Sequence, residues 1–451
     1  MSEQRDLTEG SISKALITLA IPIIFTNLLQ TAYQLIDAFW IGRLGSNAVA
    51  AVSISFPVIF FIMSLGMGVS IAGSILVAQF KGRKDVNAVN HISTQTLLFG
   101  VGFAFILGGI GFFISPIVLS LMHVPKEIFA DALSYLRISF AGIVFIFGFM
   151  IFQSILRGIG EVKLPMIIVF GTVLLNLILD PIFIFGFGPI VPMGVGGAAL
   201  VTVITQALAC FIGLYLLIKG KFEIRLESLK PDFTLLKQLV KLGFPTSIEQ
   251  STRALGMVII AGIVSSFGTR VLAAYGIGGR ILSFTIIPAM GLSMATSTLT
   301  GQNIGAKKEK RVVETFKKSG LVSFIVLSLI GVTFYIFSRE IALFFIPSDP
   351  LTVDMAATFI RYMSFGFGFM GIQLTINGIF RGSGNTHLSM LISLIGLWLF
   401  RIPLIYVLSH SFNLGEKGIW LAFPLGNILS AIVAIILLLG IGWKRTLRFY
   451  F

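Results

Sequence analysis

Six ionisable residues interrupt long apolar stretches of this sequence, and they are the residues best placed to do chemistry. They are Asp37, Asp180, Glu249, Arg253, Arg280 and Arg401. An ionisable group in a membrane helix costs roughly 2.5–3.5 kcal/mol, so such groups usually mark ion or substrate sites. Asp37 and Asp180 each precede a glycine-containing break by about six residues, which would place both roughly 9 Å from the same membrane boundary.

Two further polar residues are expected at this level. Asn176 precedes Asp180 by four positions and so shares its helix face, while Thr202 lies a similar depth into the following apolar run. Two close carboxylates repel, so one of them would hold a proton. The same hard oxygens could instead ligate a desolvated sodium ion. Each Asp could also simply bond to a neighbouring helix, but the matched set favours a site for H⁺ or Na⁺ formed by Asp37, Asn176, Asp180 and Thr202.

The other charged residues favour structural roles or stay open. Glu249 and Arg253 are four positions apart, so we expect them to neutralise each other on one helix face. Arg401 could line a cavity or bind lipid headgroups. Pro22 lies in the same apolar run as Asp37 and could act as a hinge or as a static kink, because proline removes a helix hydrogen bond. Pro245, at the matching place in the second half, favours an architectural role for at least one of the two prolines.

Composition explains what must hold these residues in place. The chain has 451 residues, of which 56% are hydrophobic and 12% charged, whereas soluble domains carry about 25% charged residues. Too few polar residues remain to coat a soluble fold, so the surface must meet lipid. The net charge is +14, and most Lys and Arg residues lie in short segments between apolar runs. This distribution fits a membrane protein better than a partner of nucleic acid. Cys210 is the single cysteine, no Walker motif is present, and we expect neither an enzyme nor a cofactor beyond the coupling ion.

Twelve apolar runs are long enough to cross a bilayer. Lys and Arg gather in the segments on one side of these runs, which predicts a multi-pass inner-membrane protein with both termini in the cytoplasm. Residues 1–10 lack a positive region leading into a cleavable segment, so no signal peptide is expected. The runs lie near residues 15–41, 47–79, 93–117, 130–156, 164–187, 195–218, 238–266, 272–302, 319–338, 355–380, 386–409 and 418–441.

The two halves of the chain repeat each other about 223 residues apart. Pro22 recurs as Pro245, and the segment Arg157-Gly-Ile-Gly160 recurs as Arg381-Gly-Ser-Gly384. Six runs separate equivalent positions, so the repeats share one orientation and should be related by a pseudo-two-fold axis along the membrane normal. We therefore predict an all-α integral membrane protein of twelve transmembrane helices in two homologous six-helix lobes. The N-lobe would be 1–218, a cytoplasmic linker 219–241 and the C-lobe 242–451.

Several segments together resemble the multidrug and toxic compound extrusion (MATE) transporters over nearly the whole chain. They are Leu35-Ile-Asp37-Ala-Phe-Trp-Ile-Gly42, Val77-Ala-Gln79, Leu156-Arg157-Gly158-Ile-Gly160, Leu175-Asn176-Leu-Ile-Leu-Asp180-Pro181 and Gly197-Ala-Ala. The branch looks like the DNA-damage-inducible F (DinF-like) type rather than the type with an acidic pair in the second half. Within the apolar runs of that half Glu249 is the only acid, offset from the acid expected there, and Gln373 or Asn377 lies near the place of a second acid.

The resemblance implies a fold, an activity and roles for particular residues. It implies export of amphipathic, often cationic compounds in exchange for H⁺ or Na⁺, with the coupling cation held by Asp37, Asn176, Asp180 and Thr202. It also implies that small molecules and the lipid bilayer are the partners, and that a monomer is functional. Further polar positions of the N-lobe cavity would be Gln30, Tyr135 and Gln153.

Three other functions compete with this reading. A flippase for a lipid-linked saccharide or another lipid would need basic residues in its cavity, and Arg253, Arg280 and Arg401 give that alternative some support. A channel would conduct without exchange. A purely structural assembly partner would not need the buried carboxylates, so the acidic cluster favours cation coupling.

Overall fold

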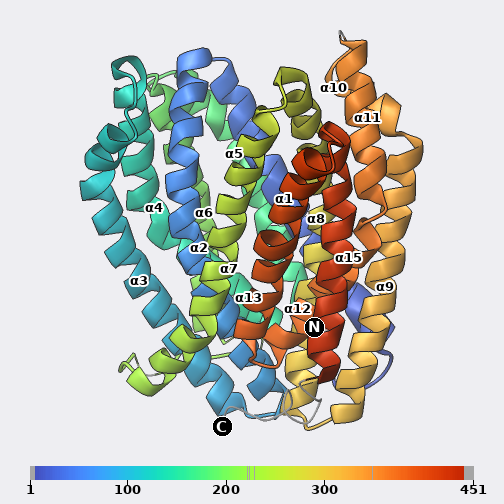
Figure 1. The fold of residues 1–451 in the computed structure, drawn as a ribbon. Helices are drawn as coiled ribbons and strands as arrows, with labels where there is room; N and C mark the ends of the chain where they lie inside the picture. Colours follow the sequence, from blue (N-terminus) through green and yellow to red (C-terminus); the bar gives the residue numbers. More distant parts are fainter. Residues whose placement is uncertain (1–5, 221, 223, 228, 348, 441–451) are drawn as a thin grey trace. The chain divides into compact units, whose positions relative to one another are not determined.

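The chain folds into long helices, and its structure is a computed structural model that describes residues 6–440 except 221, 223, 228 and 348. Helices form because each apolar run satisfies its backbone groups internally, as lipid requires. Figure 1 shows the helices of each half running alongside one another. The helices are α1 (Ile12–Gly42), α2 (Ser46–Gly82), α3 (Val86–Leu121), α4 (Lys126–Ile159), α5 (Lys163–Phe185), α6 (Gly194–Ile218), α7 (Phe233–Ser265), α8 (Thr269–Gly305), α9 (Glu309–Ile336), α10 (Ser338–Phe345), α11 (Pro350–Ser364), α12 (Phe367–Gly382), α13 (Thr386–Leu394), η2 (Ile395–Arg401), α14 (Ile402–Tyr406), η3 (Val407–Ser411) and α15 (Glu416–Gly440).

The predicted runs agree with these helices, with differences in the second half. Among the described residues, 10 helices are long and apolar enough to cross a membrane, and the bent pair α11 and α12 supplies an eleventh span. Helix α7 has 33 residues and carries Glu249 and Arg253, which lower its hydropathy. The first part of α7 also occupies residues 233–241, which the sequence assigned to the linker.

The run 355–380 is not one straight helix. Helices α11 and α12 meet at an angle of 49°. At the break the Gly366 carbonyl accepts a hydrogen bond from the Asn427 amide, and a Cβ on Gly366 would lie 2.8 Å from the Cα of Pro424. The Gly366 carbonyl also accepts the backbone N–H of Met370 at 3.0 Å, so α15 supplies a second partner to a carbonyl at the start of α12.

The span 386–411 contains two π-helical segments. The first, η2, ends at Arg401, two residues before Pro403. Because proline has no N–H and its ring crowds the preceding turn, a widened turn just before it relieves the clash. Residues of η2 are thereby turned relative to a regular helix, and Arg401 is among them.

Contacts divide the chain into two compact units, which are described separately. Among the described residues, unit 1 comprises those within 25–247, and unit 2 comprises those within 6–24 and 248–440. The boundaries fall inside α1, shortly after Pro22, and inside α7, shortly after Pro245. The lobe boundaries at 218 and 242 remain a prediction.

Small residues let the helices of unit 1 approach closely. A Cβ on Gly68 of α2 would lie 2.5 Å from the carbonyl oxygen of Gly243 on α7, too near for any side chain. In the same unit Cys210 is buried, and a Cβ on Gly148 would lie 2.6 Å from its sulfur. Close backbone approach of this kind is how helices associate in lipid, where no hydrophobic driving force acts between them.

Unit 2 has an aromatic core. Phe359 of α11 stacks on Trp420 of α15 with ring centroids 4.2 Å apart. Phe423 of α15 packs edge-on against the Phe359 ring, with centroids 5.0 Å apart. Tyr275 of α8 also stacks on Phe359, with ring centroids 6.1 Å apart. These rings join α8, α11 and α15 into one packed group.

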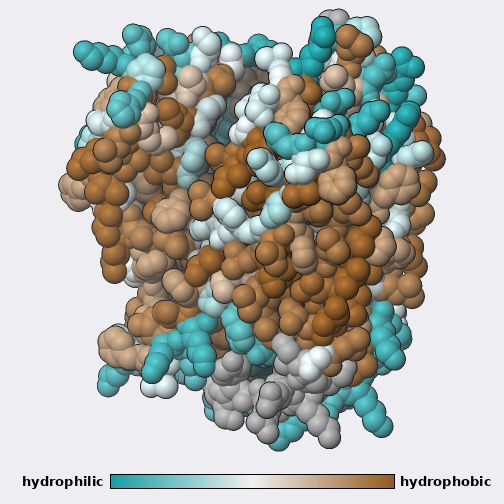
Figure 2. Space-filling model, in the orientation of Figure 1, coloured by the Kyte–Doolittle hydropathy of each residue, from teal (hydrophilic) through white to brown (hydrophobic). Residues whose placement is uncertain are grey.

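The lipid-facing surface is apolar in its middle. Large side chains such as Phe113 and Val258 are 76% and 70% exposed. Figure 2 shows apolar side chains covering the middle of the face in view, with hydrophilic ones gathered toward its ends. An exposed apolar band bounded by polar ends is the surface that a bilayer requires.

The connection between α6 and α7 is bonded to the start of α3, an arrangement called here the linker clasp. Its backbone N–H groups at Arg225 and Glu227 donate to Asn90 and Thr94 of α3, each at 2.9 Å. Two side-chain contacts extend the clasp: Gln95 Nε2 donates to the Lys230 carbonyl at 2.8 Å, and His91 Nε2 bonds to Asp232 Oδ2 at 3.0 Å.

Asp232 also caps α7. Its Oδ1 accepts hydrogen bonds from the backbone N–H groups of Thr234 and Leu235. The hydrogen bond from His91 holds the pKa of this carboxyl below its usual value, and the cap bonds act in the same direction. The clasp and the start of α7 are thus joined through one side chain.

Candidate functional site

Four polar residues of α1, α5 and α6 meet inside unit 1. Asn176 Nδ2 donates to both Asp37 Oδ1 and Asp180 Oδ1, each at 3.0 Å, and so bridges the two carboxyl groups. Thr202 Oγ1 donates to Asp37 Oδ2 at 3.4 Å. The structure therefore brings together all four residues that the sequence assigned to a cation-coupling cluster.

The cluster contains oxygens without partners. Asn176 and Asp180 are fully buried, and in the described part of the chain neither Asn176 Oδ1 nor Asp180 Oδ2 has a hydrogen-bond partner. A buried acceptor left unpaired costs about 1–3 kcal/mol. A proton on Asp180, or a desolvated hard cation among these oxygens, would remove that cost.

Position on the helices explains the convergence. Asn176 and Asp180 are separated by one helical turn on α5, so both side chains leave the same face toward α1. Asp37 is half-buried, and its second carboxyl oxygen accepts the hydrogen bond from Thr202 of α6. Among the described residues no group of three or more His, Cys, Asp and Glu could hold a metal ion. The oxygens that the cluster offers to a cation come from carboxylate, amide and hydroxyl groups.

Sequence reasoning missed two members of the cluster. Tyr33 Oη and Thr205 Oγ1 lie 2.6 Å apart, both buried, and Tyr33 lies close enough to Asp37 for the carboxylate charge to act on it. Thr205 Oγ1 also donates to the Thr202 carbonyl at 3.0 Å. Tyr33 precedes Asp37 by one turn and Thr205 follows Thr202 by three positions, so the helical spacing was the signal for both.

Of the other predicted residues, Tyr135 lies near this cluster. Tyr135 is half-buried beside Ile41 and Ala198, within electrostatic reach of Asp37. Gln153 is half-buried on α4 and Gln30 is exposed on α1; in the described part of the structure neither is hydrogen-bonded to the cluster. Pro22 is buried within α1, which continues through it as one helix. Its role as a hinge remains a prediction.

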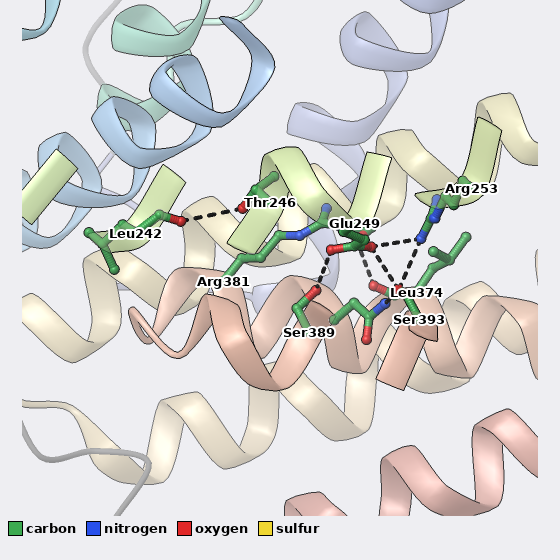
Figure 3. A network of polar contacts seen from close by, with 10 residues as sticks. Leu242, Thr246, Glu249, Arg253, Leu374, Arg381, Ser389 and Ser393 are labelled. Carbon is green, nitrogen blue, oxygen red and sulfur yellow. Dashed lines mark hydrogen bonds and ion pairs between the residues drawn. The ribbon is translucent and has the colours of Figure 1, made fainter. Parts of the chain in front are cut away.

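A second polar network lies in unit 2, around Glu249 (Figure 3). The predicted ion pair with Arg253 is confirmed, with Nη2 2.8 Å from Glu249 Oε1. Arg381 of α12, which lies just beyond the apolar run 355–380, donates to the same oxygen at 2.7 Å. Ser393 and Ser389 of α13 donate to Oε1 and Oε2 at 2.7 and 3.2 Å. Both carboxyl oxygens of Glu249 therefore accept hydrogen bonds, whereas Asp180 Oδ2 of unit 1 has no partner among the described residues.

Comparison with known proteins identifies the fold and the family. A family model described as MatE matches residues 22–182 and again residues 245–407. The chain belongs to the MatE family of transporters. Those two matches fall in the two halves that repeat in the sequence. The predicted all-α, multi-span membrane fold of about twelve helices is confirmed, and the chain is a transporter rather than an enzyme.

Relatives and solved structures agree with this assignment. The MatE chain is 31% identical over 440 residues to the probable multidrug resistance protein YpnP of Bacillus subtilis, covering 97% of each chain. It is 26% identical to the probable multidrug resistance protein NorM of Thermotoga maritima, covering 96% of this chain and 94% of the relative. A solved multidrug resistance MATE family transporter, in an outward-facing conformation, matches with a TM-score of 0.91 and 23% identity over 97% of each chain.

Proposed function

We propose that this MatE chain is an antiporter that exports amphipathic, often cationic drugs across the inner membrane in exchange for H⁺ or Na⁺. The observation that carries the proposal is the pair of carboxyl groups, Asp37 and Asp180, bridged by Asn176 within an apolar helix bundle. The names of the multidrug resistance relatives support the substrate class.

The unpaired oxygens support a cycle in which the cluster alternates between two charge states. A proton or Na⁺ entering the cluster would satisfy Asp180 Oδ2 and Asn176 Oδ1 and lower its negative charge. A cationic drug held by the same negative charge would then bind less tightly. Cation and drug thus oppose each other through a coupling free energy, which is what exchange requires.

The remaining parts of the proposal concern branch, orientation and assembly. The DinF-like branch is supported by the second half, where Glu249 is the sole buried acid among the described residues and is neutralised by two arginines. The distribution of Lys and Arg supports cytoplasmic termini. A monomer, embedded in the bilayer, is proposed as the functional unit.

Transport by purified protein in proteoliposomes tests the proposal. An imposed pH or sodium gradient should drive uptake of a lipophilic cation such as ethidium, and the gradient that works identifies the coupling ion. Asp180→Asn and Asp37→Asn should each remove the gradient-driven component while the protein still inserts and remains monodisperse. Asp131→Asn, at an exposed position of α4, is the matched control and should retain it. Full gradient-driven transport by both cluster variants would refute the proposed coupling site.

A further inference from the structure

The two halves of the chain differ in charge at a matched position of their helices. At the offset that pairs Pro22 with Pro245, the uncharged Gln30 corresponds to Arg253. The repeat therefore places a cation in the second half where the first half has a neutral amide.

The helices of unit 2 carry three largely buried arginines, Arg253, Arg381 and Arg401, and one buried carboxylate among the described residues. Arg253 and Arg381 both contact Glu249 Oε1, and the charge of Arg253 acts on Arg401 as well. Glu249 pairs with Arg253 and Arg381, but in the described part of the chain no ion pair joins Arg401 to any acid. The cluster of Glu249, Arg253, Arg381 and Arg401, called here the arginine cluster, therefore carries two uncompensated positive charges.

The hydrogen-bonding capacity of the cluster is also incompletely used. Arg401 Nη2 donates to Asn427 Oδ1, and its guanidinium lies 5.1 Å from the centre of the Phe423 ring. Among the described residues, Nε of Arg401 and Nε of Arg381 are both buried without a partner. A guanidinium presents its N–H groups as a fixed fork that fits the paired oxygens of a carboxylate or phosphate.

The elements that carry the cluster are packed tightly enough to fix it. A Cβ on Gly256, one turn after Arg253 on α7, would lie 2.4 Å from Leu397 Cδ2 of η2. The π-helical turn of η2 then sets the direction of Arg401 just before Pro403. The Arg253 side chain remains 29% exposed while that of Arg381 is 8% exposed, so Arg253 offers an approach to the buried groups.

We propose that the arginine cluster binds the acidic head, a carboxylate or a phosphate, of an amphiphilic molecule. Uncompensated charge within a membrane helix is costly, and an oxyanion on Arg253 and Arg401 would neutralise it while using the free N–H groups. The inference rests on the proposed function for transport. It adds acidic and zwitterionic amphiphiles to the cationic compounds that the chain would export. Binding itself depends only on unit 2.

Binding of matched probes to the purified full chain in a neutral detergent tests the site. The probes are a dansyl-labelled eleven-carbon fatty acid and its primary amide, which differ only in the charged head. Wild-type protein should bind the acid about tenfold more tightly than the amide, as expected for one strong charge-assisted contact. Arg401→Gln and Arg253→Gln should abolish that preference and leave binding of the amide unchanged.

Controls keep the result interpretable. Arg280→Gln removes the same charge from an exposed position of unit 2 and should leave the preference intact. Arg401→Lys keeps the charge but lacks the guanidinium fork, so it should show a weaker preference than wild type. If Arg401→Gln does not fold, Arg253→Gln tests the site alone. Equal binding of acid and amide by wild-type protein, or a preference that survives both Gln variants, would overturn the proposal.

Two further arms separate the source of the acid from the proposed export. In nanodiscs, competition by phosphatidylglycerol that depends on Arg401 identifies a lipid phosphate as the occupant, whereas gradient-driven accumulation of the labelled acid in proteoliposomes identifies a substrate. Both outcomes support the site. Asp180→Asn should keep the preference for the acid. If gradient-driven export is not observed while wild-type protein still prefers the acid, the proposed function is refuted and the binding site at the arginine cluster is retained.

Discussion

Replacing Glu249 by Gln removes the negative charge that Arg253 and Arg381 share within unit 2. The side chain keeps its size and one acceptor oxygen, so the change is mainly electrostatic. Both guanidinium groups contact Glu249 Oε1, at 2.8 and 2.7 Å, and the Glu249 side chain is fully buried. Breaking a buried ion pair by removing one partner costs about 3–5 kcal/mol, a large share of a typical stability of about 5–15 kcal/mol.

The expected loss converts into a measurable shift in melting temperature. The entropy of unfolding is about 2.1 cal/mol/K per residue, so a loss of about 4 kcal/mol should lower the melting temperature by roughly 4–8 °C, depending on whether the whole chain or unit 2 alone unfolds. Thermal unfolding in detergent, followed by size-exclusion chromatography with fluorescence detection, measures this shift. Glu314→Gln, which breaks the exposed pair with Lys318 on α9, is the control and should change little.

A double-mutant cycle makes the reasoning refutable. If charge imbalance causes the loss, adding Arg253→Gln to Glu249→Gln should recover part of the stability, because one unpaired cation is removed. If the double variant loses the sum of both single effects, or if Glu249→Gln melts with the wild type, the network is not held together by its charges.

Two other predictions concern packing and pH in unit 1. Gly68→Ala should destabilise the chain by about 1–3 kcal/mol, because the added methyl group meets a backbone carbonyl of α7, whereas Gly102→Ala, with open space around it, should not; thermal unfolding of both variants checks this. The linker clasp should loosen in acid. The pKa of Asp232 is lowered in the folded chain, so the contribution of its carboxylate to stability is fully present above its ordinary pKa of 3.8. That contribution is lost as the pH falls through the lowered pKa. Limited proteolysis of the α6–α7 connection should therefore accelerate in acid for wild-type protein, and His91→Ala should show faster cleavage already at neutral pH; identical cleavage of the two at neutral pH would contradict the clasp.

Local spacing predicted the parts of the unit 1 cluster that depend on distance along a helix. Counting residues from glycine breaks placed Asp37 and Asp180 at one depth, and helical periodicity added Asn176 on the face that the structure confirms. Thr202 followed from the same count on the next run. These residues could be found because helix geometry converts sequence distance directly into position.

Contacts between distant segments could not be found in this way. Arg381 lies 132 positions from Glu249, and its place near the end of an apolar run suggested a topological charge rather than a buried partner. The break at Gly366 and the widened turn of η2 depend on Asn427 and on a proline two residues later, so they follow from packing and backbone chemistry rather than from hydrophobic periodicity.

The single thiol of Cys210 has a practical consequence. It is the only cysteine of the chain, and it is 6% exposed, against α4 at Gly148. Maleimide or nitroxide reagents should therefore react slowly with the native protein and quickly with a cysteine introduced at an exposed site. One engineered thiol in each unit would give a pair of spectroscopic labels on an otherwise unaltered chain, and distances between them could be followed with and without an imposed ion gradient.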